Sequence, residues 1–251
     1  MKGLLQRLAA ATVLAGLALG SAAAGEIKRP LGVVELFTSQ GCNSCPRADA
    51  VFAELVKRGD LVALAYHIDY WDYLGWQDTL ASPDNTQRQY DYAKSFGANS
   101  VYTPQVVING RTHVRGSNGA AIAETLDSFA KSGEGMSVDI KVIQAGDSIV
   151  IDAGEGTGDD QGRIVLVHFN PAQLVTIDRG ENTGKTITYW NSVTAIQTVG
   201  MWHGAAARYE FPASEMVRKG AGGCAVLLQA KGANGLPGPI LGAALIDAPT
   251  N

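Results

Sequence analysis

The chain has 251 residues, of which 46% are hydrophobic and 18% are charged, and its formal net charge is −4. This composition excludes a disordered chain, and three cysteines are too few for a small protein held together by disulfides. The length predicts two domains, and the lack of a basic stripe makes nucleic acid and anionic membrane surfaces poor partner candidates.

Residues 1–24 have the features of a secretory signal peptide. Lys2 and Arg7 precede an apolar run over residues 8–19, and three alanines come before Gly25. The run is shorter than the roughly 20 residues that span a bilayer, so we expect no membrane anchor after cleavage. Cleavage removes two positive charges and changes the formal charge from −4 to −6. We expect an exported protein, either periplasmic or secreted.

Strand and helix patterns alternate after the signal peptide. Residues 32–37 form a strand candidate, and apolar residues at helical spacing over residues 48–56 predict a helix whose opposite, polar face includes Asp49. Residues 61–66 are apolar enough for a strand buried on both faces. An aromatic, acidic loop follows, and then a helix is predicted over residues 82–96.

A hairpin and a last helix complete this part of the chain. An Asn-Gly pair lies between the apolar runs 105–108 and 112–114, which predicts the hairpin, and we expect Ser117 to cap the helix. The order strand–helix–strand–helix–strand–strand–helix is the thioredoxin arrangement. Residues 25–132 are therefore predicted to form a thioredoxin-like α/β domain.

Residues 133–251 change to short strands separated by glycine-rich turns, which predicts an all-β, sandwich-like domain. The strand candidates are residues 138–142, 148–153, 163–169, 186–199, 208–211, 224–230 and 240–246. Residues 180–186 resemble a phosphate-binding loop, but three residues separate their glycines where that loop needs four. We interpret this segment as a hairpin turn. Cys224 lies within a strand candidate and is interpreted as a small buried hydrophobic residue.

The main chemical feature is Cys42 and Cys45, a Cys-x-x-Cys pair that follows a strand and opens a helix. The positive end of the helix and its unpaired N–H groups stabilise a thiolate there. We therefore expect Cys42 to be the exposed nucleophile and Cys45 the more buried resolving thiol. This context favours a redox-active pair with no further cofactor. A static disulfide or half of a zinc site are the alternatives, but no second Cys or His pair has ligand spacing.

Two further segments are predicted to reach the same edge of the sheet as the cysteines. Thr103 and Pro104 begin the third strand, where we expect a cis bond facing the two sulfurs; the alternative is an ordinary trans proline. His67, Asp69 and Trp71 follow the second strand. His67 is either a thiolate partner and proton relay or a histidine that simply ends a strand. Trp71 lines a peptide-binding groove or packs within an ordered loop.

Several motifs resemble a secreted, thioredoxin-like family catalogued as domain of unknown function 1223. They are Val34–Pro46, His67–Trp76, Tyr102–Gln105 and Gly180–Asn191. The resemblance spans nearly the whole mature chain. It implies a thioredoxin-like domain with a β-rich partner domain, and it implies no particular activity.

The residues support three functional hypotheses. The first is an exported thiol–disulfide oxidoreductase that acts on protein thiols or disulfides, in which Cys42 exchanges with the substrate and Cys45 resolves the mixed disulfide. The second is a metallochaperone that binds a soft ion such as Cu(I) through Cys42, Cys45 and His67. The third is a binding protein in which the thioredoxin-like domain is a scaffold and the disulfide a fixed brace.

Overall fold

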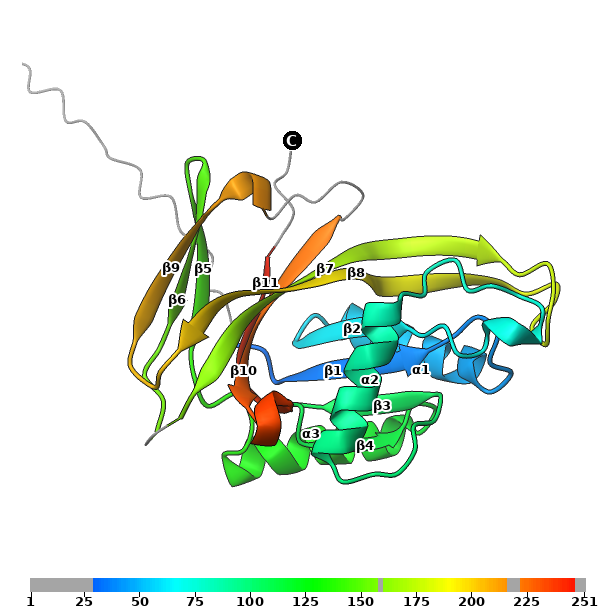
Figure 1. Ribbon diagram of the computed structural model, residues 1–251, viewed down its shortest axis with the longest axis horizontal. Helices are drawn as coiled ribbons and strands as arrows, with labels where there is room; N and C mark the ends of the chain where they lie inside the picture. Colours follow the sequence, from blue (N-terminus) through cyan, green and yellow to red (C-terminus); the bar gives the residue numbers. More distant parts are fainter. Residues whose placement is uncertain (1–28, 158–159, 216–221, 247–251) are drawn as a thin grey trace, which may run out of the picture.

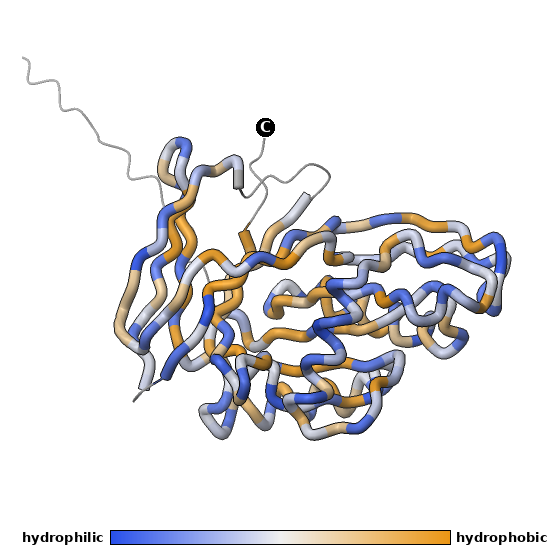
Figure 2. The backbone as a smooth tube through the Cα atoms, in the orientation of Figure 1, coloured by the Kyte–Doolittle hydropathy of each residue, from blue (hydrophilic) through white to orange (hydrophobic). Residues whose placement is uncertain are grey.

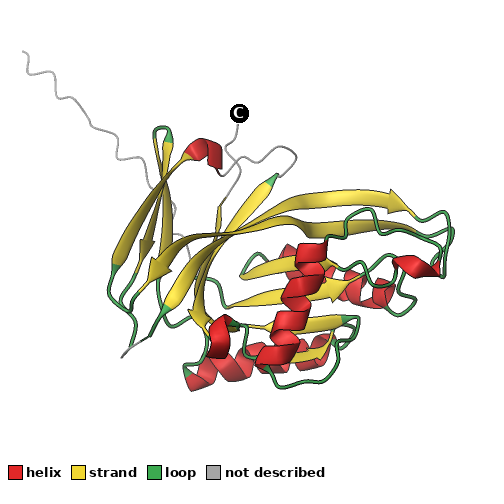
Figure 3. Ribbon diagram, in the orientation of Figure 1, coloured by secondary structure: helices red, strands yellow, loops and turns green. Residues whose placement is uncertain are grey.

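The computed structural model describes residues 29–157, 160–215 and 222–246 (Figure 1), so the predicted signal peptide lies outside the described residues. Its helices and strands, in chain order, are β1 (Gly32–Thr38), α1 (Cys45–Arg58), β2 (Leu61–His67), α2 (Pro83–Ser95), β3 (Gln105–Ile108), β4 (Thr112–Arg115), α3 (Gly119–Ser132), β5 (Ile140–Ala145), β6 (Ser148–Ala153), β7 (Gly162–Thr176), β8 (Thr186–Trp202), β9 (Ala207–Pro212), β10 (Gly223–Lys231) and β11 (Pro237–Ile246). The three α-helices lie at one end of the molecule, and the other end consists mainly of strands (Figure 3).

The strands form one large mixed sheet and one small sheet. The large sheet has eight strands in the order β11-β10-β7-β8-β2-β1-β3-β4, and the small sheet has the order β5-β6-β9. β1 pairs with β2 in parallel and with β3 in antiparallel orientation, and β3 pairs with β4. The element order up to α3 therefore agrees with the sequence prediction.

The second half of the chain agrees only in part with the expected all-β, sandwich-like domain: it consists of strands in two layers, but most of its strands share a sheet with the first half. β7, β8, β10 and β11 extend the sheet of the first half, and only β5, β6 and β9 make a layer of their own. The junction is a parallel contact in which Ala65 of β2 pairs with Ser192 of β8. Next to it, the Asn191 side chain donates a hydrogen bond to the Ala63 carbonyl (2.9 Å). The physical reason is that β2, buried and apolar, would otherwise leave an unpaired edge.

Three groups of buried side chains hold these layers together. One group lies between β1–β3 and the helices α1 and α3, and includes Leu36, Phe52 and Leu126. A second group includes Phe37, Tyr66 and Tyr92, with Tyr92 on α2. The third fills the space between the two sheets, with Trp202 and Ile151 fully buried among its members. The strands are mostly hydrophobic, and the turns between them are mostly hydrophilic (Figure 2).

A buried ion pair within the first half of the chain is connected to the second half by hydrogen bonds. Glu35 on β1 is fully buried, and its carboxylate accepts a hydrogen bond from Arg88 on α2 (2.8 Å). The Tyr92 hydroxyl donates to the same carboxylate and accepts from Gln229 of β10 (2.8 Å). Because each polar group has a partner, the network offsets the cost of burying two charges.

The helix ends show how local sequence fixes these elements. Pro46 lies in the first turn of α1, where its missing N–H costs nothing, and Gly59 ends the helix in a left-handed conformation. α3 departs from the sequence prediction, because its cap is Asn118 and not Ser117. The Asn118 side-chain oxygen accepts a hydrogen bond from the Ala121 N–H (3.1 Å). A side-chain amide oxygen is as good a helix cap as a hydroxyl oxygen. The sequence alone therefore does not decide which of two neighbouring capping residues is used.

Candidate functional site

The site is built around a disulfide between Cys42 and Cys45, whose Cα atoms are 5.4 Å apart. Cys42 lies in the turn after β1, and Cys45 is the first residue of α1. The Cys45 N–H donates a hydrogen bond to the Cys42 carbonyl (3.1 Å), which closes the turn. Both sulfurs therefore lie at the helix N-terminus, as the sequence predicted.

The expectation that Cys42 is exposed is wrong. Cys42 is only 2% exposed, and Cys45 is fully buried. One cover is the loop of residues 68–80, in which Trp71 packs so closely that a Cβ atom on Gly41 would lie 3.2 Å from the Trp71 Cβ. The other cover is Asn182, in the turn between β7 and β8, which bonds to the Cys42 carbonyl. The sequence analysis placed Trp71 at this edge of the sheet, but the local pattern gave no sign that the turn with Asn182 would contact Cys42.

A chain of two hydrogen bonds connects Trp71 to the sulfur of Cys42 through Thr103. The Thr103 hydroxyl donates to the Cys42 Sγ (3.3 Å) and accepts from the Trp71 indole N–H (2.7 Å). The Thr103–Pro104 peptide bond is cis, which confirms that expectation. The structure thus brings Thr103 and Trp71 together at Cys42, and a hydroxyl in this position can stabilise a thiolate.

His67 has a carboxylate partner that the sequence analysis did not single out. Its Nδ1 lies 2.8 Å from the Asp78 Oδ2, and both side chains are fully buried. Burial opposes the charge on His67, but the carboxylates of Asp78 and Asp49 outweigh it and raise the His67 pKa above 6.5. No hydrogen bond joins His67 to the described atoms of the disulfide; its ring instead meets the Tyr189 ring edge-on at 4.8 Å between centroids.

Asp49 is the second buried carboxyl group, and its predicted place on the polar face of the helix is wrong. It lies one turn after Cys45 on α1 and is 6% exposed, because α1 contacts β8 as well as the strands of the first half. Burial raises the pKa of Asp49 to about 7, although His67 and the Thr38 hydroxyl favour the ionised form. Thr38 donates to Oδ1 (2.7 Å), and Oδ2 has no hydrogen-bond partner among the described residues.

Gln40 connects the groups that cover the disulfide. Its N–H donates to the Asp78 carboxylate (2.7 Å), and its side-chain oxygen accepts from the Trp76 indole (2.8 Å). Its carbonyl accepts from the Asn182 amide (2.8 Å). The backbone before Cys42 is therefore held from two sides. A loop between a strand and a helix carries no sequence signal for such partners, because they lie far away in the chain.

Two other predicted residues lie away from this chemistry. Asp69 accepts a hydrogen bond from the Thr86 hydroxyl (2.7 Å), which ties the loop after β2 to α2. Cys224 is buried, as predicted, and burial raises the pKa of its thiol to about 12. A buried thiol with a raised pKa carries little thiolate at neutral pH, so we expect Cys224 to take no part in exchange.

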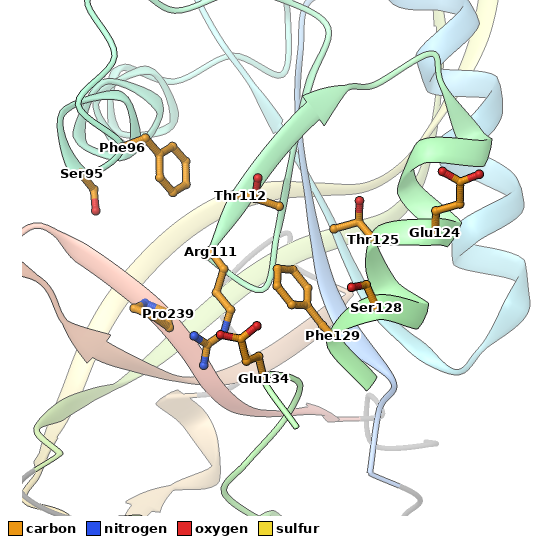
Figure 4. A pocket seen from close by; sticks show the side chains of 11 residues that line it. Ser95, Phe96, Arg111, Thr112, Glu124, Thr125, Ser128, Phe129, Glu134 and Pro239 are labelled. Carbon is orange, nitrogen blue, oxygen red and sulfur yellow. The ribbon is translucent and has the colours of Figure 1, made fainter. Parts of the chain in front are cut away.

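A cavity of about 720 Å³ lies at the opposite end of the sheet from the disulfide (Figure 4). Arg111, Phe96 and Phe129 are among the side chains that line it. Arg111 follows the end of β3 that pairs with the start of β1, whereas Cys42 follows the end of β1. The cavity is therefore separate from the disulfide site.

Two features are absent from the described residues. They contain no group of three or more His, Cys, Asp or Glu side chains arranged to hold a metal ion. None of the helices in the described part of the chain is long and apolar enough to cross a membrane.

These features define a mixed α/β protein with a covered Cys-x-x-Cys disulfide at a helix N-terminus. The chain belongs to the family described as "Protein of unknown function (DUF1223)", whose pattern matches residues 33–229. It is similar to the crystal structure of a structural-genomics target protein from Agrobacterium tumefaciens, with 45% sequence identity and a TM-score of 0.81. The match covers 89% of this chain and 97% of the other. No curated protein matches the chain.

Proposed function

We propose that the protein is an exported, thioredoxin-like thiol–disulfide oxidoreductase whose redox centre is the Cys42–Cys45 disulfide. The observation that carries the proposal is the placement of this disulfide at the N-terminus of α1, with the Thr103 hydroxyl on the Cys42 sulfur. Both features stabilise the thiolate that exchange requires. A carboxyl group with a pKa near neutrality, Asp49, lies one helical turn from Cys45. In this proposal residues 25–132 form the redox domain, and residues 133–251 form the β-rich part that extends its sheet.

The substrate class is a protein dithiol or disulfide. A substrate thiolate attacks the Cys42 Sγ, so that a mixed disulfide forms, the bond to Cys45 breaks, and the electron pair of that bond stays on the Cys45 sulfur. Asp49 in its protonated form gives this sulfur a proton. A second substrate thiolate then attacks the mixed disulfide and releases the oxidised substrate and the Cys42 thiolate. Two electrons pass from the substrate to the cysteine pair, and the reverse reaction uses the same steps in reverse order.

The buried position of Cys42 adds a condition to this scheme. The sulfur of a residue that is 2% exposed cannot meet a protein thiol until the 68–80 loop or the turn around Asn182 moves aside. The Trp71–Thr103 hydrogen bond and the stacking of Trp71 on the exposed ring of Tyr73 (6.4 Å between centroids) are the contacts that a substrate would rearrange.

The test is exchange with a peptide that carries two cysteines. We expect the purified protein to exchange disulfides with this peptide, the C42S variant to lose exchange completely, and the C45S variant to accumulate a mixed disulfide visible by mass. C224S is the matched control and should retain full activity, because that thiol is buried and protonated. Full activity in C42S would overturn the proposal.

A further inference from the structure

The turn between β7 and β8 brings the second half of the chain to the disulfide. Among the described residues, 162–169 of β7 pair with β10, and Ser192 of β8 pairs with Ala65 of β2. Beyond these pairs β7 and β8 continue as a two-stranded ribbon (Figure 1). The segment that resembles a phosphate-binding loop in sequence, residues 180–186, ends this ribbon as a turn. Backbone hydrogen bonds between Ile177 and Gly184 (2.8 Å) and between Lys185 and Ile177 (2.9 Å) close the turn.

Asn182 is the residue of this turn that reaches the redox centre. It is 1% exposed, and its amide nitrogen donates to the carbonyl oxygens of Gln40 (2.8 Å) and Cys42 (2.9 Å). Its oxygen accepts a hydrogen bond from the Lys185 ammonium group (2.6 Å). The orientation of the amide is fixed by these partners, because carbonyls only accept and an ammonium group only donates.

We propose that Asn182 is a positioning residue that holds the backbone on both sides of Gly41 and stabilises the thiolate of Cys42 in the reduced protein. This inference rests on the proposed function, because it assigns the turn between β7 and β8 to the same redox site. It also gives residues 133–251 a part in the chemistry.

The two carbonyl groups that Asn182 contacts affect the Cys42 thiolate electrostatically. The Cys42 carbonyl belongs to the same residue as the sulfur, and the Gln40 carbonyl lies two residues before it; the partial negative charge on each disfavours a nearby thiolate. A hydrogen bond from Asn182 draws electron density from both carbonyls, and Lys185 polarises the amide further, since hydrogen bonds in a chain strengthen one another at low dielectric. The other ionisable groups around the disulfide are Asp49 on α1, His67 on β2 and Asp78 in the 68–80 loop.

The test uses the N182D and N182A variants. Aspartate has nearly the shape of asparagine, but it offers no donor and sets a carboxylate against two carbonyl oxygens. The readout is the pH midpoint of Cys42 alkylation in chemically reduced protein, followed by mass. The midpoint reports thiolate formation, whereas the plateau rate also responds to access. We expect the N182D midpoint to rise by about one pH unit, or about tenfold less thiolate below it, and the N182A midpoint to rise less.

Two further variants make the test specific. In K185M the Asn182 amide stays in place without its charged partner, so the midpoint should rise, by less than in N182D. T183A is the matched control, because the Thr183 hydroxyl is exposed and donates only to the Gly180 carbonyl within the turn; its midpoint should equal that of the unchanged protein. Thermal unfolding confirms that each variant is folded.

The inference is overturned if folded N182D and N182A have the alkylation midpoint of the unchanged protein. This result is independent of the proposed function, because the midpoint can be measured on reduced protein whether or not the disulfide exchanges with a substrate. Failure of the proposed function would appear separately, as an absence of exchange in the unchanged protein.

Discussion

Replacing Asp49 by asparagine should make the protein more stable at alkaline pH and slower in disulfide exchange. In the folded protein burial raises the Asp49 pKa from 3.8 to about 7. A proton is therefore bound more tightly in the folded than in the unfolded state. The stabilisation from this proton is fully present below pH 4 and is lost as the pH rises through about 7. Asparagine remains neutral throughout and escapes this loss.

The size of the stability change follows from the shift in the Asp49 pKa. A difference of roughly three pKa units corresponds to about 4 kcal/mol of unfolding free energy between acidic and alkaline pH. The asparagine side chain keeps the hydrogen bond from Thr38, but its N–H group takes the place of Oδ2, which has no partner among the described residues. An unpaired buried donor costs about 1 kcal/mol. D49N should therefore be more stable by about 3 kcal/mol at pH 8, and about 1 kcal/mol less stable at pH 4.

The assay is urea unfolding of the oxidised protein at both pH values, combined with the rate at which Cys45 leaves the disulfide. The rate should fall roughly 100-fold in D49N, which is the low end for loss of a general acid or base. E54Q is the matched control, because Glu54 is an exposed carboxylate on the same helix. Equal destabilisation of D49N at both pH values, with an unchanged rate, would refute the reasoning.

Two other substitutions test neighbouring parts of the account. T103V removes the hydroxyl that donates to the Cys42 sulfur, so the alkylation midpoint of reduced Cys42 should rise by about one pH unit. T103S retains a hydroxyl and should have the midpoint of the unchanged protein. An unchanged midpoint in T103V would contradict this role of Thr103. R88M leaves Glu35 buried without its charged partner, so the free energy of unfolding in urea should fall by about 3–5 kcal/mol. The double variant E35L/R88M should recover most of this loss. Equal stability of R88M and the unchanged protein would contradict the importance of the pair.

The sequence predicted the features that depend on neighbouring residues. Apolar spacing predicted α1, an Asn-Gly pair predicted the β3–β4 hairpin, and the Cys-x-x-Cys pair lies where the strand-to-helix transition placed it. These signals are local, because helical periodicity and turn chemistry act over a few residues. The hairpin turn expected at residues 180–186 was found for the same reason.

The sequence could not predict the features that depend on distant segments. Asp49 looked solvent-facing because a helical pattern does not show that β8 covers a second flank of α1. Asn182 lies 140 residues from Cys42 and donates a hydrogen bond to the Cys42 carbonyl. A contact between one side chain and a distant backbone group produces no periodic pattern in the sequence. The joining of β8 to β2 likewise depends on a pairing between strands far apart in sequence. Periodicity indicates which face of a helix or strand is apolar, but it does not indicate which other element covers that face.

A redox titration tests the central claim most directly. The purified protein is equilibrated with glutathione or dithiothreitol buffers, and the state of Cys42 and Cys45 is read by thiol alkylation and mass. The account predicts a reversible two-electron transition between about −270 and −120 mV, the range of working oxidoreductases. A disulfide that resists reduction down to about −300 mV would behave as a structural bond and would contradict the redox function.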